Sequence, residues 1–225
     1  MRIRALVLAT LLIISSTVSV IASDTVTTQD VDLSGNHTMT GNYTVSHGTT
    51  LTINPGSTID MQDYWMKVEG TLVADNATIM SSIQTTGAGS HNAGVWDALT
   101  ITQIGSADLD NVTISNAKSC IIVEGSMTAK SLTIEDCLIG IEISGTAHIS
   151  ELSAAHIDND GFRVTGVATL SDLDLTDMSA GISSDGDLTL TGAEFTDVGT
   201  GISLSGGTAD VATLNFNPGV GNAVS

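Results

Sequence analysis

Pairs of apolar residues separated by one polar residue recur along the second half of the chain. This alternation has the two-residue period of a β-strand with one buried face, and no window shows the 3.6-residue period of a helix. Three such pairs fall within every 20 residues or so, separated by short polar corners. In the repeat that begins at Gly125 they are Met127 with Ala129, Leu132 with Ile134, and Ile141 with Ile143. The pattern predicts three short strands per repeat.

Glycines mark the period of this repeat. One series opens each unit: Gly105, Gly125, Gly145, Gly166, Gly186 and Gly206. A second series stands five residues ahead of most of them, with Cys120 in the equivalent position: Gly140, Gly161, Gly181 and Gly201. A fixed period near 20 residues is typical of stacked units, none of which buries its apolar face alone. We therefore predict an all-β protein built as a single-stranded parallel β-helix, a solenoid with about 20 residues per coil.

The corners between strands carry residues that suit unusual backbone conformations. Eleven residues after most of the opening glycines stand Asn116, Asp136, Asp177, Asp197 and Asn217, and the longer unit from Gly145 has Asp158 and Asn159 nearby. Asparagine and aspartate tolerate the left-handed region and bond to their own turn amides. At the other corners we expect glycine to supply a positive φ.

The repeat continues upstream with less regularity, and this sets the expected domain boundaries. Between Gly70 and Gly105 one coil carries an insertion, which we expect to form a loop over residues 82–97. Residues 23–47 are polar and rich in threonine, and we expect a cap or an incomplete first coil there. The solenoid should then span 48–225, as about eight coils in a rod about 40 Å long. The last unit fades without a closing element. Either Asn217 to Gly219 turn the chain across the end or, as we favour, the sequence is a fragment that lacks its C-terminal cap.

The first residues of the chain predict export. Arg2 and Arg4 precede an apolar run over 5–14, and small residues follow near position 22. This order is typical of a secretory signal peptide, which we place at 1–22. The alternative is an uncleaved membrane anchor, which the serines from Ser15 onward disfavour. No later segment approaches the roughly 18 apolar residues of a spanning helix. We expect a secreted, extracellular or cell-surface protein.

The formal net charge is −19, from 25 acidic and 6 basic residues. Such a surface repels phosphates, which excludes a nucleic-acid partner. It also repels anionic lipids and polyanionic substrates unless a cation bridges them, and its simplest role is solubility. Cys120 and Cys137 are the only two cysteines. Export permits a disulfide between them, but the sequence leaves their pairing open.

Several stretches carry a resemblance to a known family. They are Tyr43 to Gly56, Met66 to Ala74, Trp96 after the insertion, and Leu109 to Ala117. Together they resemble the right-handed parallel β-helix repeat proteins of bacterial and archaeal cell surfaces, in the pectate-lyase-like superfamily. The resemblance covers about 43–225 and implies a right-handed coil. It says little about activity, because that superfamily includes lyases, hydrolases, epimerases, adhesins and inert stalks.

The resemblance implies one place to look for catalysis. Lyases that resemble pectate lyase need Ca²⁺-binding carboxylates and a basic residue that abstracts a proton. Arg163 is expected to point outward, and His156, Asp158 and Asp160 precede it, so these four are the candidate catalytic residues. The alternative, which we favour, is a polar corner of a slightly longer coil. The motifs of the hydrolases of this fold, which use paired carboxylates, are absent.

The chain offers little sign of a metal site. No two of the five histidines have a zinc-ligand spacing beside cysteines. Outward carboxylate pairs could hold Ca²⁺ loosely, although a solvated acidic face is the favoured interpretation. These pairs are Asp108 with Asp110, Asp172 with Asp174, and Asp185 with Asp187. We expect no cofactor and no resident metal, with Ca²⁺ as the alternative.

Two features point to a role at a surface. Trp96 and His91 in the insertion could contact a glycan through a stacked sugar ring, unless Trp96 folds over the core. Four Asn-x-Ser/Thr sequences are candidate N-glycosylation sites: Asn36, Asn42, Asn76 and Asn111.

We interpret the chain as a non-enzymatic cell-surface structural or adhesion module, an acidic glycoprotein with surface glycans or envelope proteins as partners. The alternative is a polysaccharide-active lyase or hydrolase. A minor alternative is an ice-binding solenoid, because Thr189 and Thr191 form a Thr-x-Thr pair, but the threonine array decays within two coils.

Overall fold

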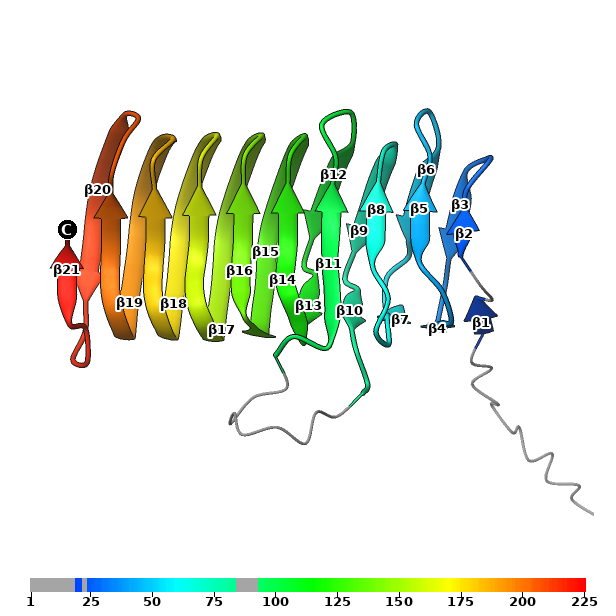
Figure 1. Ribbon diagram of the computed structural model, residues 1–225, viewed down its shortest axis with the longest axis horizontal. Coiled ribbons are helices and arrows are strands. Elements are labelled where there is room, and N and C mark those ends of the chain that lie inside the picture. Colours follow the sequence, from blue (N-terminus) through cyan, green and yellow to red (C-terminus); the bar gives the residue numbers. More distant parts are fainter. Residues whose placement is uncertain (1–18, 22–23, 84–92) are drawn as a thin grey trace, which may run out of the picture.

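The computed structural model describes residues 19–21, 24–83 and 93–225. Throughout these ranges the regular structure is β-strand, and every strand pairing is parallel. The strands stack as a β-solenoid of about ten turns with roughly 20 residues per turn (Figure 1). This confirms the predicted fold class. Across the same residues there is no helix of the length and apolarity needed to cross a membrane.

The strands form three faces, and the ladder hydrogen bonds join each coil to the next. The first face contains β3 (Val31–Leu33), β6 (Thr50–Ile53), β9 (Thr71–Asp75) and β12 (Ser106–Asp110). The second contains β1 (Ser19–Ile21), β4 (Asn36–Met39), β7 (Thr58–Asp60), β10 (Thr78–Met80) and β13 (Thr113–Ser115). The third contains β2 (Thr25–Val26), β5 (Tyr43–Val45), β8 (Met66–Val68), β11 (Trp96–Ile101), β14 (Ala117–Val123) and β16 (Ile139–Ile143).

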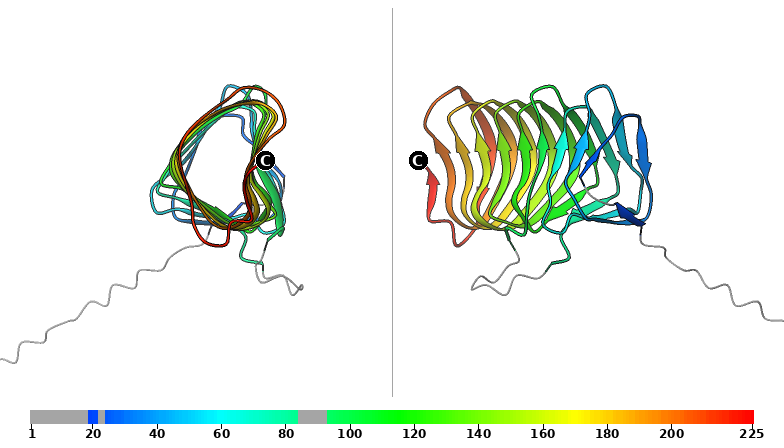
Figure 2. Two further views of the ribbon diagram at one scale, coloured as in Figure 1. Left: turned by 90° about the vertical axis from the view of Figure 1, so that its left-hand side faces the viewer. Right: turned by 45° about the vertical axis from the view of Figure 1, so that its right-hand side comes forward.

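Toward the C-terminus the short strands merge into long ones that bend around the corners. Strand β15 (Ser126–Cys137) covers the first two faces, as does β20 (Ala209–Phe216). Strands β17 (Thr146–Val164), β18 (Val167–Ser184) and β19 (Asp187–Leu204) each cover all three, and β21 (Asn222–Val224) ends the third face. Viewed along the axis, successive coils superpose closely (Figure 2).

The core is a continuous apolar column inside the coils. Equivalent residues stack in register, so that Ala147 pairs with Ala168 and Ala168 with Leu188 along the first face. The inward pairs expected after Gly125 are all buried, with 2% or less of their surface exposed. Each coil therefore buries its apolar side chains against the coils before and after it, as the repeat period requires.

The backbone conformation of the glycines that open the repeats differs from the one expected. Gly105, Gly145 and Gly186 lie outside the positive-φ region, which corrects the prediction that they supply it. They are needed for space instead, because a Cβ atom on Gly145 would lie 2.2 Å from the carbonyl oxygen of Gly125 in the preceding coil. A backbone oxygen of the preceding coil approaches as closely at Gly70, Gly105, Gly125, Gly166 and Gly186.

Two ladders of mainly non-glycine residues provide the positive φ at the corners. One runs through Asn76, Asn111, Ser131, Glu151 and Asp172, and the other through Asn116, Asp136, His156, Asp177 and Asp197. In the longer coil the corner residue is thus His156 rather than Asp158 or Asn159. The extra residue of that coil forms an irregularity between Ile157 and Asp160, just after the corner.

The boundaries of the solenoid differ from those expected. Within 24–47, strands β2 to β5 pair with the next coil, so this segment belongs to the rod and raises the number of turns above eight. Strand β1 lies within the predicted signal peptide and pairs with β4, and the rest of that segment lies outside the described residues. Of the expected loop, residues 84–92 also lie outside them. Its last two residues, Trp96 and Asp97, open β11 instead.

Candidate functional site

Arg163 lies on the third face, in β17, between two buried neighbours of the same strand. Its guanidinium forms a two-pronged interaction with Asp160, with Nη2 at 2.6 Å and Nε at 3.1 Å from Oδ2. Its Nη1 lies 3.5 Å from Oε2 of Glu142, the residue at the same place in the preceding coil. Arg163 is therefore held between two carboxylates by charge-assisted hydrogen bonds.

Both carboxylates of this cluster have further donors from neighbouring coils. Ser183 donates from Oγ to Asp160 at 2.8 Å, and Ser119 donates from Oγ to Glu142 at 2.5 Å. The cluster thus crosses four successive coils of the third face. Arg163 thus shares two carboxylates, and the hydrogen bonds of the cluster link these coils to one another.

The other two catalytic candidates lie apart from this cluster. His156 occupies its corner with Nδ1 3.3 Å from Oδ1 of Asp136. Asp158 is exposed, and its backbone carbonyl accepts a hydrogen bond from Ser179 Oγ at 2.6 Å. The structure therefore brings Arg163 together with Asp160 alone of the three. Glu142 could have been found from the sequence, because it precedes Arg163 by one full coil.

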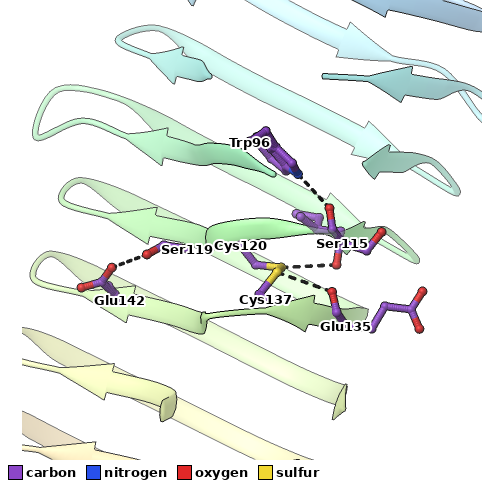
Figure 3. Close-up of a disulfide and its surroundings, with 8 residues drawn as sticks. Trp96, Ser115, Ser119, Cys120, Glu135, Cys137 and Glu142 are labelled. Carbon is purple, nitrogen blue, oxygen red and sulfur yellow. Dashed lines mark hydrogen bonds between the residues drawn. A yellow bond between two sulfur atoms is a disulfide. The ribbon is translucent and has the colours of Figure 1, made fainter. Parts of the chain in front are cut away.

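Trp96 is a core residue. Its side chain is fully buried, and Nε1 donates a hydrogen bond to the Ser115 carbonyl at 2.8 Å (Figure 3). A buried indole offers no face to a sugar ring, so the structure contradicts glycan contact at Trp96 and confirms the alternative that Trp96 folds over the core. The prediction placed Trp96 in a loop, whereas its alignment with Ala117 carries it into the third face. His91 lies outside the described residues.

The other tryptophan, Trp65, is half-buried and lines a hollow on the third face. The hollow has a volume of about 400 Å³. It is lined by Trp65, Lys67, Asp97, Ala98, Thr100, Lys118, Ser119 and Ile122. Trp65 was not among the candidate residues, although its position next to the inward Met66 indicates that its side chain points outward.

Cys120 and Cys137 form a disulfide with their Cα atoms 5.9 Å apart (Figure 3). Cys120 lies within β14 on the third face of one coil, and Cys137 ends β15 in the next coil, so the bond links two adjacent coils. The sulfur atoms lie 3.4 and 3.5 Å from the carbonyl oxygens of Ile114 and Glu135. A disulfide sulfur carries no proton, so these are close contacts rather than hydrogen bonds.

The remaining candidates lie on the surface. Asn36, Asn76 and Asn111 are exposed and Asn42 is half-buried, with its Oδ1 3.3 Å from the backbone nitrogen of Trp65. The Asp108 and Asp110 side chains are exposed on the first face, as are those of Asp172, Asp174, Asp185 and Asp187 elsewhere. Within the described part of the chain, no three potential ligands gather in a group that could hold a metal ion.

One of these carboxylates is electrostatically perturbed. Asp187 accepts hydrogen bonds from Thr208 Oγ1 at 2.8 Å and from Thr208 N at 3.0 Å. Hydrogen bonds favour the charged form, so they lower the pKa of Asp187, with the side-chain bond contributing most.

Comparison with protein-family models, curated proteins and solved structures gave no significant match to this chain.

Proposed function

We propose that the protein is a non-catalytic, exported structural or adhesion module of the cell surface, a right-handed β-helix of the pectate-lyase-like type. It would hold a rigid rod of acidic and hydroxyl-bearing faces between the surface and a partner. The supporting observation is the state of Arg163, the basic residue of the candidate catalytic group. Asp160 and Glu142 neutralise it, while His156 and Asp158 lie away from it.

The remaining surface also supports a presenting role. Equivalent outward residues stack on one another from coil to coil, as Thr58, Thr78, Thr113 and Thr133 do along the second face. Such ladders form regular surfaces whose side chains are set by the backbone register, at little conformational cost on binding a partner.

The proposal is tested by assaying the full-length exported protein for release of reducing ends. The panel contains neutral and acidic polysaccharides, each with and without Ca²⁺, and circular dichroism verifies the β-fold of every sample. We expect no release above the buffer control. In a parallel binding assay, immobilised protein should retain surface glycans or envelope proteins without altering them.

The variant Arg163→Gln sharpens the test, with Lys130→Gln as the matched control on the first face. Turnover by the wild type that Arg163→Gln abolishes and Lys130→Gln preserves would contradict the proposal. It would place an active site on the third face.

A further inference from the structure

The hollow beside Trp65 arises from the size of neighbouring side chains in register. Leu99 pairs with Met66, the residue after Trp65, and Ala98 pairs with Ser119 in the following coil. Ala98 and Ser119 line the hollow together with Trp65, and both are small beside its indole. The indole borders the space that they leave, and at about 400 Å³ this space falls in the roughly 300–1,000 Å³ range of small-molecule sites.

Thr100 and the two residues that pair with it also line the hollow. Thr100 lies between Lys67 and Ile122, with which it pairs in the two adjacent coils. The lining thus combines an aromatic ring and aliphatic groups with hydroxyl, ammonium and carboxylate groups around the rim. An apolar surface with a few polar groups at its edge is the usual composition of a ligand site.

The charges around the hollow are paired, unlike those of the protein as a whole. Lys67 Nζ lies 2.8 Å from Glu69 Oε1, and Lys118 forms a salt bridge with Asp97. The hollow is thus close to neutral on a chain of net charge −19. A polyanion would find both lysines of the hollow already paired with carboxylates, and the acidic rod would repel it. An uncharged ligand would not be repelled.

We propose that this hollow is a binding subsite for an uncharged glycan, with one pyranose ring stacked on the Trp65 indole. A pyranose presents an apolar face of C–H groups, which packs on an aromatic ring, and a rim of hydroxyls that both donate and accept. Thr100 and Asp97 supply acceptors, and the two lysines supply donors. The inference deepens the proposed function, on which it rests, by assigning a ligand class to the module.

Intrinsic fluorescence tests the site directly, because the chain has two tryptophans and Trp96 is buried in the core. The full-length exported protein is titrated with cello-, xylo-, manno- and chito-oligosaccharides, and with oligogalacturonate as the charged comparison. We expect a saturable change in emission with at least one neutral oligosaccharide. Its affinity should change little between low and high salt.

Two variants and one control assign the signal to the hollow, with affinities measured by calorimetry. Trp65→Ala removes the stacking surface, and Thr100→Gln fills the hollow while leaving the indole in place. Each should weaken binding by about tenfold or more, in line with the loss of about 1.4 kcal/mol of contact. Val73→Thr changes an exposed side chain on the first face that does not line the hollow, and this variant should bind as the wild type does.

The outcomes separate this inference from the proposed function. Absence of saturable binding to every neutral glycan, or binding unchanged in both variants, would overturn the subsite. So would salt-sensitive binding of oligogalacturonate alone. Reducing ends are measured in the same samples: their release would contradict the non-catalytic function, whereas loss of the subsite without release would leave that function standing.

Discussion

Asn111 donates a hydrogen bond from its side-chain Nδ2 to Oδ1 of Asn76 at 2.9 Å. The two residues occupy equivalent corners of successive coils, and both have a positive φ, of 52° and 45°. Side chains that tolerate this backbone conformation thus also bond to one another along the rod axis. The corner ladder therefore adds a polar link between coils outside the sheet hydrogen bonds.

This corner predicts a graded response to substitution. Asn111→Ala should lower the free energy of unfolding by about 1–2 kcal/mol, because alanine resists the left-handed region and cannot form the bond. Asn111→Gly loses only the bond and should cost less than half as much. Urea unfolding at equilibrium measures both. Equal losses in the two variants would show that backbone strain contributes nothing at this corner.

The period glycines predict a steric effect that depends on position. Gly145→Ala places a Cβ atom 2.2 Å from the Gly125 carbonyl oxygen, and overpacking of this kind typically costs about 1–3 kcal/mol. At Gly206 the nearest atom is the carbonyl oxygen of Asp185, 3.0 Å away, so Gly206→Ala should be milder. Chemical denaturation of the two variants should show the larger loss for Gly145→Ala, and the reverse order would contradict the close-approach explanation.

The disulfide predicts sensitivity to reductant. The loop between Cys120 and Cys137 spans 17 residues, for which the chain-entropy relation gives about 3 kcal/mol of stabilisation. The double variant Cys120→Ala/Cys137→Ala should therefore unfold at a lower urea concentration than the wild type. Reductant should lower the wild-type midpoint toward that of the variant and leave the variant unchanged. A wild-type midpoint indifferent to reductant would argue against a stabilising bond.

The two tryptophans predict losses of stability of different size for the same substitution. Trp96→Phe leaves a void in the core and deprives the Ser115 carbonyl of its donor, and should cost about 2–4 kcal/mol. Trp65→Phe changes a half-buried ring at the surface and should cost less than about 1 kcal/mol. Thermal and urea unfolding compare the pair. A larger loss from Trp65→Phe would mean that the core assignment of Trp96 is incorrect.

The lowered pKa of Asp187 predicts a pH effect of defined sign. A carboxyl whose pKa is lower in the folded than in the unfolded state stabilises the fold above its unfolded pKa, near 3.8. This contribution is lost as the pH falls through the folded-state pKa, so it disappears below about pH 4. Carbon-detected NMR titration should find Asp187 titrating below 3.8 in the wild type. Thr208→Val should move it back toward that value, with Thr189→Val as the control on the same strand as Asp187.

Much of the surface chemistry required the register between coils. The sequence placed Arg163 outward beside Asp160, and both positions hold in the structure. The register between coils brings Glu142 next to Arg163, where it completes the ion pairs. It also brings His156 next to Asp136 instead of Arg163. The loop was expected to extend to residue 97, whereas β11 begins at Trp96, which pairs with Ala117 in the following coil.

By itself the sequence determined the fold class, because a 20-residue period with two-residue alternation has one physical solution: short parallel strands that share a core with their neighbours. It also determined most inward positions, since these follow from local alternation. Only the tertiary structure showed that the period glycines are required by close backbone approach between coils. It also decided that Cys120 and Cys137 face each other, and where the hollow beside Trp65 lies. These features arise between residues 17 to 35 positions apart, where stacking distances rather than local preferences set the contacts.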